Sequence, residues 1–444
     1  MIARLSLWLA LLVVGITPTS IHAAKPNFVI VLCDDLGAGD LGCYGHPRIR
    51  TPNLDAMAKA GMKLEQCYAA APVCSPSRAG MLTGRDPNRY GIRDWIPANS
   101  GIRLPPTETT IATLLKNAGY RTGLFGKWHL NSKMDGSEPM PVDHGFQQYF
   151  ATQNNAAPSH ENPTNFIRDG KPVGPLTGNS TSILVDESIR WLDTVGNDPF
   201  LLVITLHAPH EPVATPAKFT EPYADIEDAT KRTYFGSVSL VDAEVGRLLA
   251  ELDRRKLGES TLVWFTSDNG PETLNRYKAA NHSHGTPGKL TGMKLHLTEG
   301  GIRVPGILRW TGTIPAGKIS QEPISGIDLL PTLLELAGRP PMRDRFLDGV
   351  SVAPVILGKP FKRSQPLYWQ YDRALGGWNV ALRSGDYKLM ADRTLSQFRL
   401  VNLATDPLEQ TDLAATEPKV FADLKATLQT KHYQINLGAI RRKP

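Results

Sequence analysis

The stretch Asn27-Phe28-Val29-Ile30-Val31-Leu32-Cys33-Asp34-Asp35-Leu36-Gly37 decides the fold class of this 444-residue chain. Residues 27–33 are almost wholly apolar, and the run has the length of a strand that is buried on both faces. Two aspartates and a turn-forming Leu-Gly pair follow it directly. Because ligands bind at the carboxyl ends of strands in open α/β sheets, this order predicts a parallel sheet with a polar site at one edge.

Helical and strand patterns alternate after this stretch. We predict strands over residues 121–126, 199–206, 261–266 and 302–310. We predict helices over residues 51–62, 107–119 (capped by Thr107), 180–195, 228–257 and 327–337. The alternation indicates an α/β fold, in which helices cover both faces of a large, mainly parallel sheet.

The pattern changes after Lys359-Pro360. Short strands are predicted over residues 367–371, 380–383, 388–391 and 398–403, with Ser384-Gly385-Asp386 as a hairpin turn, and a last helix over 418–433. We therefore expect a large α/β domain over residues 24–359 and a small α+β subdomain with an antiparallel sheet over residues 360–444.

The first residues have the order of a secretory signal peptide. Arg4 precedes an apolar run from Leu5 to Ile16, and small residues lead to Ala23-Ala24. The run is short for a membrane span, and we find no later apolar stretch long enough to be one. We expect a signal peptide over residues 1–23, cleaved near Ala23 or Ala24, and an exported protein, periplasmic or extracellular, without stable membrane insertion.

Composition is that of an ordinary globular protein, with 41% hydrophobic and 21% charged residues. The formal charge of +6 is spread along the chain and forms no basic arm, so we expect no nucleic-acid partner. The four cysteines, Cys33, Cys43, Cys67 and Cys74, all lie in the first fifth of the chain. Sequence alone assigns no disulfide among them.

Cys74-Ser75-Pro76-Ser77-Arg78 leads into the apolar run Ala79-Gly80-Met81-Leu82-Thr83-Gly84-Arg85. Pro76 suits the first turn of a helix, and the amino end of a helix favours an anion. The pattern indicates a modified cysteine beside an anion-binding site. A buried structural cysteine before a helix is the commoner use of this residue and is the alternative.

Oxygen ligands follow two of the predicted strands: Asp34 and Asp35 follow the first, and Asp268 and Asn269 follow residues 261–266. Three carboxylates and an amide oxygen suit Ca²⁺ or Mg²⁺. Each motif alone could also be a turn-forming cap. Their joint occurrence after strands of one sheet favours a metal site.

Cationic groups follow other strands. Gly126-Lys127-Trp128-His129 follows residues 121–126, His207 and His210 follow residues 199–206, and Lys289 and Lys294 precede Glu299-Gly300-Gly301. Lysine and arginine bind anion oxygens through charge-assisted hydrogen bonds, and histidine transfers protons near neutral pH. The pattern leaves open which histidine and which lysine of each pair acts.

Taken in order, these motifs resemble those of the type I, formylglycine-dependent sulfatases of the alkaline phosphatase superfamily. The resemblance covers nearly all of the mature chain, as far as Leu403-Ala404-Thr405-Asp406-Pro407. In that family the cysteine is oxidised to formylglycine (3-oxoalanine), whose hydrate attacks a sulfate ester, and one divalent metal, usually Ca²⁺, is bound. The resemblance therefore implies a sulfuric ester hydrolase.

The resemblance also implies a role for each motif residue. Asp34, Asp35, Asp268, Asn269 and the modified Cys74 would hold Ca²⁺, Arg78 would steady the formylglycine hydrate, and Lys127 and Lys294 would bind sulfate oxygens. His210 would protonate the leaving alcohol, and His129 would take a proton from the second hydroxyl. The family's Pro-His-x-Pro pattern favours His210 over His207, and its spacing to Glu299-Gly300-Gly301 favours Lys294 over Lys289. Thr291, where many relatives have arginine, and the apolar Leu295-His296-Leu297 depart from the pattern.

The segments Gln153-Asn154-Asn155, Asn162-Pro163 and Asp169-Gly170-Lys171-Pro172 resemble bacterial arylsulfatases and N-acetylgalactosamine-6-sulfatase-like enzymes. This resemblance implies a sulfated carbohydrate substrate, such as a glycosaminoglycan or an algal or mucin-type fragment. It also implies a formylglycine-generating or sulfatase-maturating enzyme as a partner. Candidate substrate residues are His160, Asn165, His207 and Trp378.

Two other functions fit parts of the pattern. A phosphatase or phosphodiesterase of the same superfamily would use a serine or threonine nucleophile and commonly two zinc ions, and Cys74 argues against it. A non-catalytic sulfoglycan-binding protein would result if Cys74 were not matured.

Overall fold

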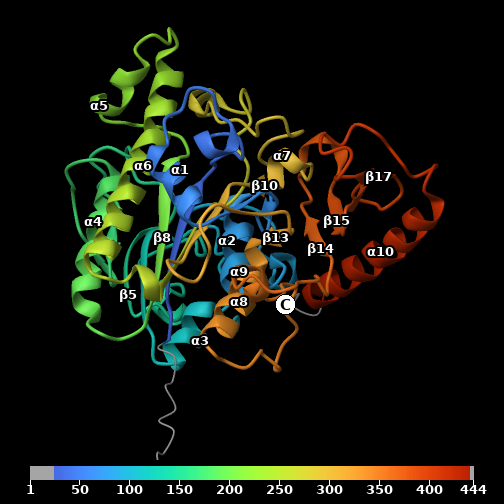
Figure 1. The fold of residues 1–444 in the computed structure, drawn as a ribbon, viewed down its shortest axis with the longest axis horizontal. Helices are drawn as coiled ribbons and strands as arrows, with labels where there is room; N and C mark the ends of the chain where they lie inside the picture. Colours follow the sequence, from blue (N-terminus) through green and yellow to red (C-terminus); the bar gives the residue numbers. More distant parts are fainter. Residues whose placement is uncertain (1–24, 441–444) are drawn as a thin grey trace, which may run out of the picture.

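The computed structural model describes residues 25–440, with side chains up to residue 437, so the predicted signal peptide lies outside the described residues. Its main feature is a ten-stranded sheet in the order β12-β2-β11-β9-β1-β8-β4-β5-β6-β7. Figure 1 labels β5 and β8 of this sheet, with α4 and α6 beside them. The strands of this sheet are β1 (Asn27–Asp34), β2 (Met62–Leu64), β4 (Arg121–Lys127), β5 (Gln148–Thr152), β6 (Ile167–Arg168), β7 (Lys171–Pro172), β8 (Phe200–Pro209), β9 (Thr261–Ser267), β11 (Gly306–Arg309) and β12 (Lys318–Ser320).

The centre of the sheet is parallel. Ile30 of β1 pairs with Val203 of β8 on one side and with Trp264 of β9 on the other, and β4 and β5 continue the parallel order beyond β8. Antiparallel strands flank this centre, since β11 runs against β9 and β6 runs against β5. The carboxyl ends of five strands therefore meet at one edge, as the alternating pattern predicts.

Helices cover both faces of the sheet. Val29 and Val31 of β1 pack in one core with α1 (Pro52–Ala60), α4 (Ser180–Val195) and α6 (Ala229–Arg254). Phe28 and Ile30 pack in a second core with α2 (Cys74–Thr83), α3 (Ile111–Asn117) and α8 (Leu329–Leu336). Apolar side chains on both faces of one strand explain the continuous apolar run in the sequence. The remaining short helices are α5 (Ala217–Thr220), α7 (Glu299–Ile302) and α9 (Ala353–Ile356).

Four of the predicted helices are shorter than expected, namely α1, α3, α6 and α8, and two of them show a local cause. Helix α1 ends at Ala60 because Gly61 lies against the neighbouring backbone, where a Cβ would stand 2.0 Å from the carbonyl oxygen of Leu308. Met62 then begins a strand. Helix α3 begins at Ile111 and its cap is Thr110, whose Oγ1 accepts a hydrogen bond of 3.2 Å from the amide of Thr113, so Thr107 is not the cap.

The predicted strand over residues 302–310 is split between two sheets. Residues before Pro305 form α7 and β10 (Arg303–Val304), which joins β3 (Cys67–Tyr68) and β13 (Ile324–Ser325) in a three-stranded sheet. Residues after it form β11 of the main sheet. Proline lacks the amide hydrogen that a continuous ladder needs, so the chain changes sheets there. Strand β5 was not predicted.

The C-terminal region is an antiparallel meander of β14 (Leu367–Gln370), β15 (Val380–Ser384), β16 (Tyr387–Ala391) and β17 (Phe398–Asn402). Helix α10 (Pro418–Ile440) covers one face of it, as the right side of Figure 1 shows. The other face contributes Trp369 and Met390 to a core that includes Val73 and Cys74. The small sheet therefore packs directly on the start of α2, and the predicted α/β plus α+β architecture is confirmed.

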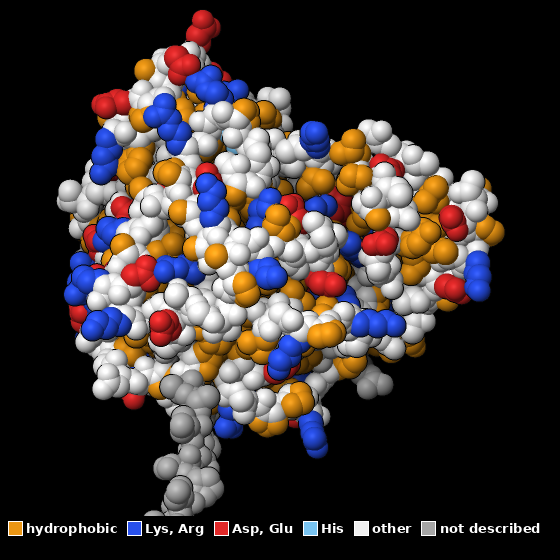
Figure 2. All heavy atoms as spheres, in the orientation of Figure 1, with side chains coloured by type: hydrophobic (Ala, Val, Ile, Leu, Met, Phe, Trp, Pro, Cys, Tyr) orange, Lys and Arg blue, Asp and Glu red, His pale blue; other side chains and the backbone are white. Residues whose placement is uncertain are grey.

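Figure 2 shows lysine and arginine side chains interspersed with aspartate and glutamate on the face in view, without a single large basic patch. Among the described residues, we find no helix that is both long enough and apolar enough to span a membrane.

Candidate active site

The polar residues predicted at strand ends converge at one edge of the main sheet. Asp34 and Asp35 stand at the end of β1, Lys127 ends β4, His210 follows β8, and Asp268 follows β9. Helix α2 brings Cys74 and Arg78 from the other side. A cavity of about 550 Å³ opens above them, and its lining includes Cys74, Lys127, His129, His210 and Lys294.

Hydrogen bonds and ion pairs join these side chains into one buried network. Nζ of Lys127 lies 2.5 Å from Oδ2 of Asp34, and Nζ of Lys294 lies 2.7 Å from Oδ2 of Asp35. Arg78 donates through Nε to Oδ2 of Asp268 at 2.9 Å, and its Nη2 lies 3.3 Å from Asp34. We call Asp34, Asp35, Arg78, Lys127, Asp268, Asn269 and Lys294 the active-site cluster.

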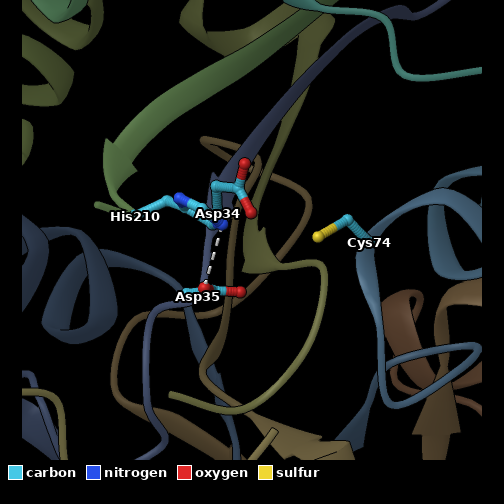
Figure 3. A group of neighbouring side chains, drawn as sticks. All are labelled: Asp34, Asp35, Cys74 and His210. Atoms are coloured by element: carbon cyan, nitrogen blue, oxygen red, sulfur yellow. Dashed lines mark ion pairs between the residues drawn. The ribbon is translucent and has the colours of Figure 1, made fainter. Parts of the chain in front are cut away.

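Two oxygen atoms of this cluster have no partner in the described residues. Oδ1 of Asp34 and Oδ1 of Asn269 are buried without a hydrogen bond, although Nδ2 of Asn269 donates to Asp35 at 2.6 Å. An unpaired buried acceptor costs about 1–3 kcal/mol, and a cation would satisfy both. Asp34, Asp35, Cys74 and His210 also offer ligand atoms within 4.8 Å of one another (Figure 3). The residues therefore fit a divalent cation with oxygen ligands.

Cys74 is the first residue of α2, and Figure 3 shows its sulfur pointing toward the carboxylate of Asp34. Its side chain is 3% exposed, and every residue of α2 is buried. Burial raises the pKa of the thiol to about 12, against the opposing effect of Lys127 and Lys294. The amino end of the helix adds a partial positive charge at this point, which favours an anion beside Cys74.

Burial and charge set the protonation of the surrounding groups. Burial alone would raise the pKa of Asp34, but Lys127, His210 and Arg78 together hold it well below its usual range. For Asp35 burial outweighs Lys294 and raises the pKa to about 6. Burial opposes the charge on His210, yet the neighbouring Asp35 and Asp34 raise its pKa.

The backbone around the site is strained at residues that point into it. Asp35, His129 and Leu295 have φ angles of 62°, 53° and 72°, which non-glycine residues rarely adopt. Such conformations cost about 1–3 kcal/mol each and persist where the surroundings fix them. At Gly126, with φ of 120°, a Cβ would stand 1.8 Å from the carbonyl oxygen of Thr205, so only glycine fits before Lys127.

The structure separates the residue pairs that the sequence left open. Nε2 of His210 lies 3.5 Å from Asp35 and the residue lines the cavity, whereas His207 lies inside β8 with Nε2 2.7 Å from the hydroxyl of Thr152. Lys294 is buried in the cluster, whereas Lys289 is exposed and outside the lining. His210 and Lys294 therefore line the cavity, whereas His207 and Lys289 do not.

The expected substrate residues do not line the cavity. His160 and His207 are buried, with ring centroids 5.7 Å apart, and neither is part of the cavity lining. Trp378 is partly buried against the core below the C-terminal sheet, outside the lining. Asn165 holds a neighbouring loop through a 2.9 Å hydrogen bond to the carbonyl oxygen of Asn155.

Several lining residues were missed. Glu211 of the lining stands beside His210, with Oε2 3.0 Å from Nδ1. Glu272 was missed too; it is not part of the lining but lies 3.3 Å from Nζ of Lys294. Their nearness to His210 and Asn269 in the sequence was the available signal. Other missed residues of the lining come from distant loops without such a signal: Asp94, Trp95, Arg276, Tyr277, Tyr371, Arg373 and Leu375.

This fold, with a cluster of carboxylates and cations at the strand ends, is that of the alkaline phosphatase superfamily. Within it the chain belongs to the sulfatase family. The Sulfatase family profile matches residues 26–339, and the profile of the N-sulphoglucosamine sulphohydrolase C-terminal region matches residues 293–436. The chain is a type I sulfatase, a family whose members use formylglycine and a metal ion.

Individual relatives agree with this assignment. The chain is 34% identical over 390 residues to the N-acetylgalactosamine-6-sulfatase of Canis lupus familiaris, covering 82% of this chain and 71% of that one. It is 32% identical over 435 residues to the steryl-sulfatase of Homo sapiens, covering 80% and 73%. The crystal structure of Ps i-CgsB in complex with k-i-k-neocarrahexaose matches with a TM-score of 0.82 at 29% identity, covering 93% of each chain. Family and relatives support a sulfuric ester hydrolase.

Proposed function

We propose that this protein hydrolyses the sulfate esters of a sulfated carbohydrate, using a formylglycine made from Cys74 and one Ca²⁺ ion. The position of Cys74 carries the proposal. It stands at the amino end of α2 and lines the cavity, with its sulfur toward the carboxylate of Asp34 and with Lys127 and Lys294 in the same lining. Oxidation by a formylglycine-generating or sulfatase-maturating enzyme would supply an aldehyde hydrate as the nucleophile there.

The active-site cluster suits a cation and an anion together. Asp34, Asp35, Asp268 and Asn269 would hold Ca²⁺, with the modified Cys74 beside them, and the ion would offset negative charge on the ester. Within the cluster three carboxylates face three permanent cations, Arg78, Lys127 and Lys294. A divalent ion therefore leaves an excess of positive charge, which an anionic ester partly offsets.

The cations bind and orient the ester. Lys127 and Lys294 line the cavity and would donate charge-assisted hydrogen bonds to sulfate oxygens. Arg78 is held by two contacts of 2.9 and 2.8 Å to Asp268, so its position beside residue 74 is fixed in advance. Fixed donors in an enclosed site stabilise developing charge more strongly than mobile donors in water.

Two histidines are suited to opposite proton transfers. Glu211 contacts Nδ1 of His210 at 3.0 Å, so Nε2 faces the cluster, where it would protonate the leaving alcohol. Nε2 of His129 lies 3.2 Å from the carbonyl oxygen of Ile96, which can only accept, so the proton is on Nε2. The unpartnered Nδ1 is then free to take a proton. Burial and the charges of Lys127 and Arg78 lower the pKa of His129 well below its usual value, which favours this neutral form.

Two comparisons support a carbohydrate substrate. One relative is an N-acetylgalactosamine-6-sulfatase, and the Ps i-CgsB structure holds k-i-k-neocarrahexaose. The cavity, at about 550 Å³, exceeds what a sulfate group alone requires, so it leaves room for part of a saccharide. We infer a glycosaminoglycan or an algal or mucin-type fragment, acted on by an exported protein that has neither nucleic-acid partners nor stable membrane insertion.

Sulfate release from p-nitrophenyl sulfate by the purified full chain, expressed with a maturation enzyme, tests the proposal. Mass spectrometry of the peptide with residue 74 should show the aldehyde, and Cys74→Ala should abolish release while the melting temperature stays within a few degrees. Comparable turnover of p-nitrophenyl phosphate would favour the phosphatase alternative. Full activity with an unmodified thiol would refute the formylglycine mechanism.

A further inference from the structure

Two segments that lie far apart in the sequence form the outer wall of the cavity. Asp94 and Trp95 come from the loop after Ile92, and Tyr371, Arg373 and Leu375 come from the loop between β14 and β15. The hydroxyl of Tyr371 donates to Oδ1 of Asp94 at 3.0 Å, and Nη1 of Arg373 lies 3.1 Å from Oδ2 of Asp94. The C-terminal subdomain therefore completes the cavity, and these contacts fix the wall.

An exposed aromatic face belongs to this wall. Trp95 is 43% exposed and Leu375 is 37% exposed, although both line a concave site. Single hydrophobic residues on a convex surface need no explanation, but an indole in the wall of a cavity offers a flat apolar surface to a ligand. The C–H face of a sugar ring is an apolar surface of matching shape, and Trp provides a large contact area for it.

Polar groups beside the indole form a neutral pair. The side chain of Arg373 is 78% exposed and that of Asp94 is 25% exposed, so both are accessible from the cavity. Together they present a donor next to an acceptor, which matches two neighbouring hydroxyls of a sugar. Arg276, on the same lining, is paired with Glu272 at 2.7 Å. This part of the wall therefore suits a hydroxyl-bearing ring better than a second sulfate.

We propose that Trp95, Asp94 and Arg373 form the subsite for the sugar ring that carries the leaving hydroxyl. Trp95 stacks on the face of the ring, and the Asp94–Arg373 pair binds its hydroxyls. The inference rests on the proposed sulfate-ester hydrolysis and assigns the choice of substrate to residues outside the active-site cluster. None of the three belongs to the active-site cluster, so we assign them to specificity and not to catalysis.

Steady-state kinetics of Trp95→Ala and Arg373→Ala test the subsite. The substrates are p-nitrophenyl sulfate and a panel of sulfated saccharides that includes N-acetylgalactosamine 6-sulfate and k-i-k-neocarrahexaose. For the best saccharide, each variant should raise KM about tenfold or more and change kcat less. Inhibition by inorganic sulfate, which occupies only the inner site, should stay within twofold. Arg373→Ala should also leave turnover of p-nitrophenyl sulfate within twofold, because that substrate has no sugar hydroxyls.

Matched controls remove general surface effects. Tyr433→Ala removes an aromatic side chain that is 64% exposed outside the cavity, and Arg393→Ala removes an exposed arginine there. Both should behave as wild type. Failure to release sulfate from p-nitrophenyl sulfate and from every saccharide would count against the proposed function itself. If p-nitrophenyl sulfate is hydrolysed, two results would overturn the subsite and leave the proposed function standing. Either no saccharide is hydrolysed, or both wall variants keep their saccharide KM within twofold.

Discussion

Two clusters of buried charge lie close to each other in this protein and differ in one respect. The first is the active-site cluster. The second, which we call the Glu299 cluster, comprises Tyr68, Glu299, Lys388 and Glu409. Nζ of Lys388 donates to Glu299 at 2.9 Å and to Glu409 at 2.8 Å, and the hydroxyl of Tyr68 donates to Glu299 at 2.6 Å. It joins the C-terminal sheet to α7.

Among the described residues, each polar side-chain atom of the Glu299 cluster has a hydrogen-bond partner, as is usual for buried polar groups. The active-site cluster instead leaves Oδ1 of Asp34 and Oδ1 of Asn269 unpaired beside a cavity. A saturated cluster can only hold structure together, whereas an unsaturated one can bind. Local violations of good packing are expected at functional sites.

The largest effect should come from Lys388→Met. Lys388 is fully buried, and its loss leaves Glu299 and Glu409 close together without their shared cation. Breaking a buried ion pair in this way costs about 3–5 kcal/mol in the free energy of unfolding. Urea denaturation measures it, with the exposed Lys362→Met as the control. Activity per folded molecule should be unchanged. A loss of unfolding free energy below about 1 kcal/mol would mean that the Glu299 cluster does not stabilise the fold.

Lys127→Met should lower the catalytic rate strongly and the free energy of unfolding only moderately, which is the reverse of Lys388→Met. Removing a donor aimed at the reacting group costs about 10²–10³-fold in rate, or about 2.7–4 kcal/mol of barrier. The loss of unfolding free energy should be smaller than for Lys388→Met, because Arg78 still contacts Asp34 at 3.3 Å. The kcat for p-nitrophenyl sulfate and urea denaturation give the two numbers. An unchanged kcat with a large loss of unfolding free energy would show that Lys127 serves the fold, as Lys388 does, and not catalysis.

Ca²⁺ should stabilise only the unsaturated cluster. A ligand at about 100 times its Kd adds about 2.7 kcal/mol to the free energy of unfolding, and chelation should remove this gain together with activity. Melting curves of chelator-treated protein, recorded before and after Ca²⁺ is added back, measure this gain in stability. Asp34→Asn should lose most of the stabilisation by Ca²⁺, and Lys388→Met should keep it. Equal increments in both variants would place the ion elsewhere.

A third charged contact gives a pH-dependent test. Asp348 accepts from Nε of Arg89 at 2.6 Å and from Nζ of Lys431 at 2.7 Å, tying the loop before α9 to α10. Burial opposes its charge, but Arg89 and Lys431 lower its pKa below the ordinary value. Its contribution is therefore full above about pH 4, the unfolded pKa, and is lost as the pH falls through the lower folded pKa.

Asp348→Asn should therefore cost about 1–3 kcal/mol at pH 7. Urea denaturation from pH 7 to pH 3 should show the wild-type advantage shrinking at the acid end of the range. A difference that stays constant with pH would show that the carboxylate charge is not what stabilises this contact.

The smallest effect should come from Arg48→Ala. Its ion pair with Asp225 is solvent-exposed, with the two side chains 48% and 66% exposed, so it should contribute at most about 1 kcal/mol and less in high salt. Urea denaturation at low and high salt provides the check. A larger, salt-independent loss would show that burial is not what separates strong from weak charge contacts here.

Sequence predicts best where function and local structure coincide. Asp34, Asp35, Asp268 and Asn269 could be placed together because each pair directly follows an apolar run, and parallel strands bring such ends to one edge. His207 was expected to follow the strand and to be a candidate site residue, because the strand was predicted to end at Leu206. Strand β8 continues to Pro209, which encloses His207 and leaves His210 at the edge.

The outer wall of the cavity could not be predicted from residues that follow strands. Asp94 and Tyr371 are separated by 277 positions in the chain, and no local pattern indicates that they meet. Their contact depends on how the C-terminal sheet docks on α2, which is a property of packing between whole faces. The same holds for Lys388 and Glu299, two charged residues whose burial only the assembled structure reveals.

The complete burial of α2 limits when Cys74 could be oxidised relative to folding. Under the proposed formylglycine mechanism, an enzyme that oxidises Cys74 would need to bind the residues around it, and α2 has no exposed residue in the folded chain. Oxidation would then have to precede folding of this segment. A molecule that folded first would keep its thiol and lack the proposed nucleophile, so the specific activity of a preparation would report the fraction of chains oxidised before folding.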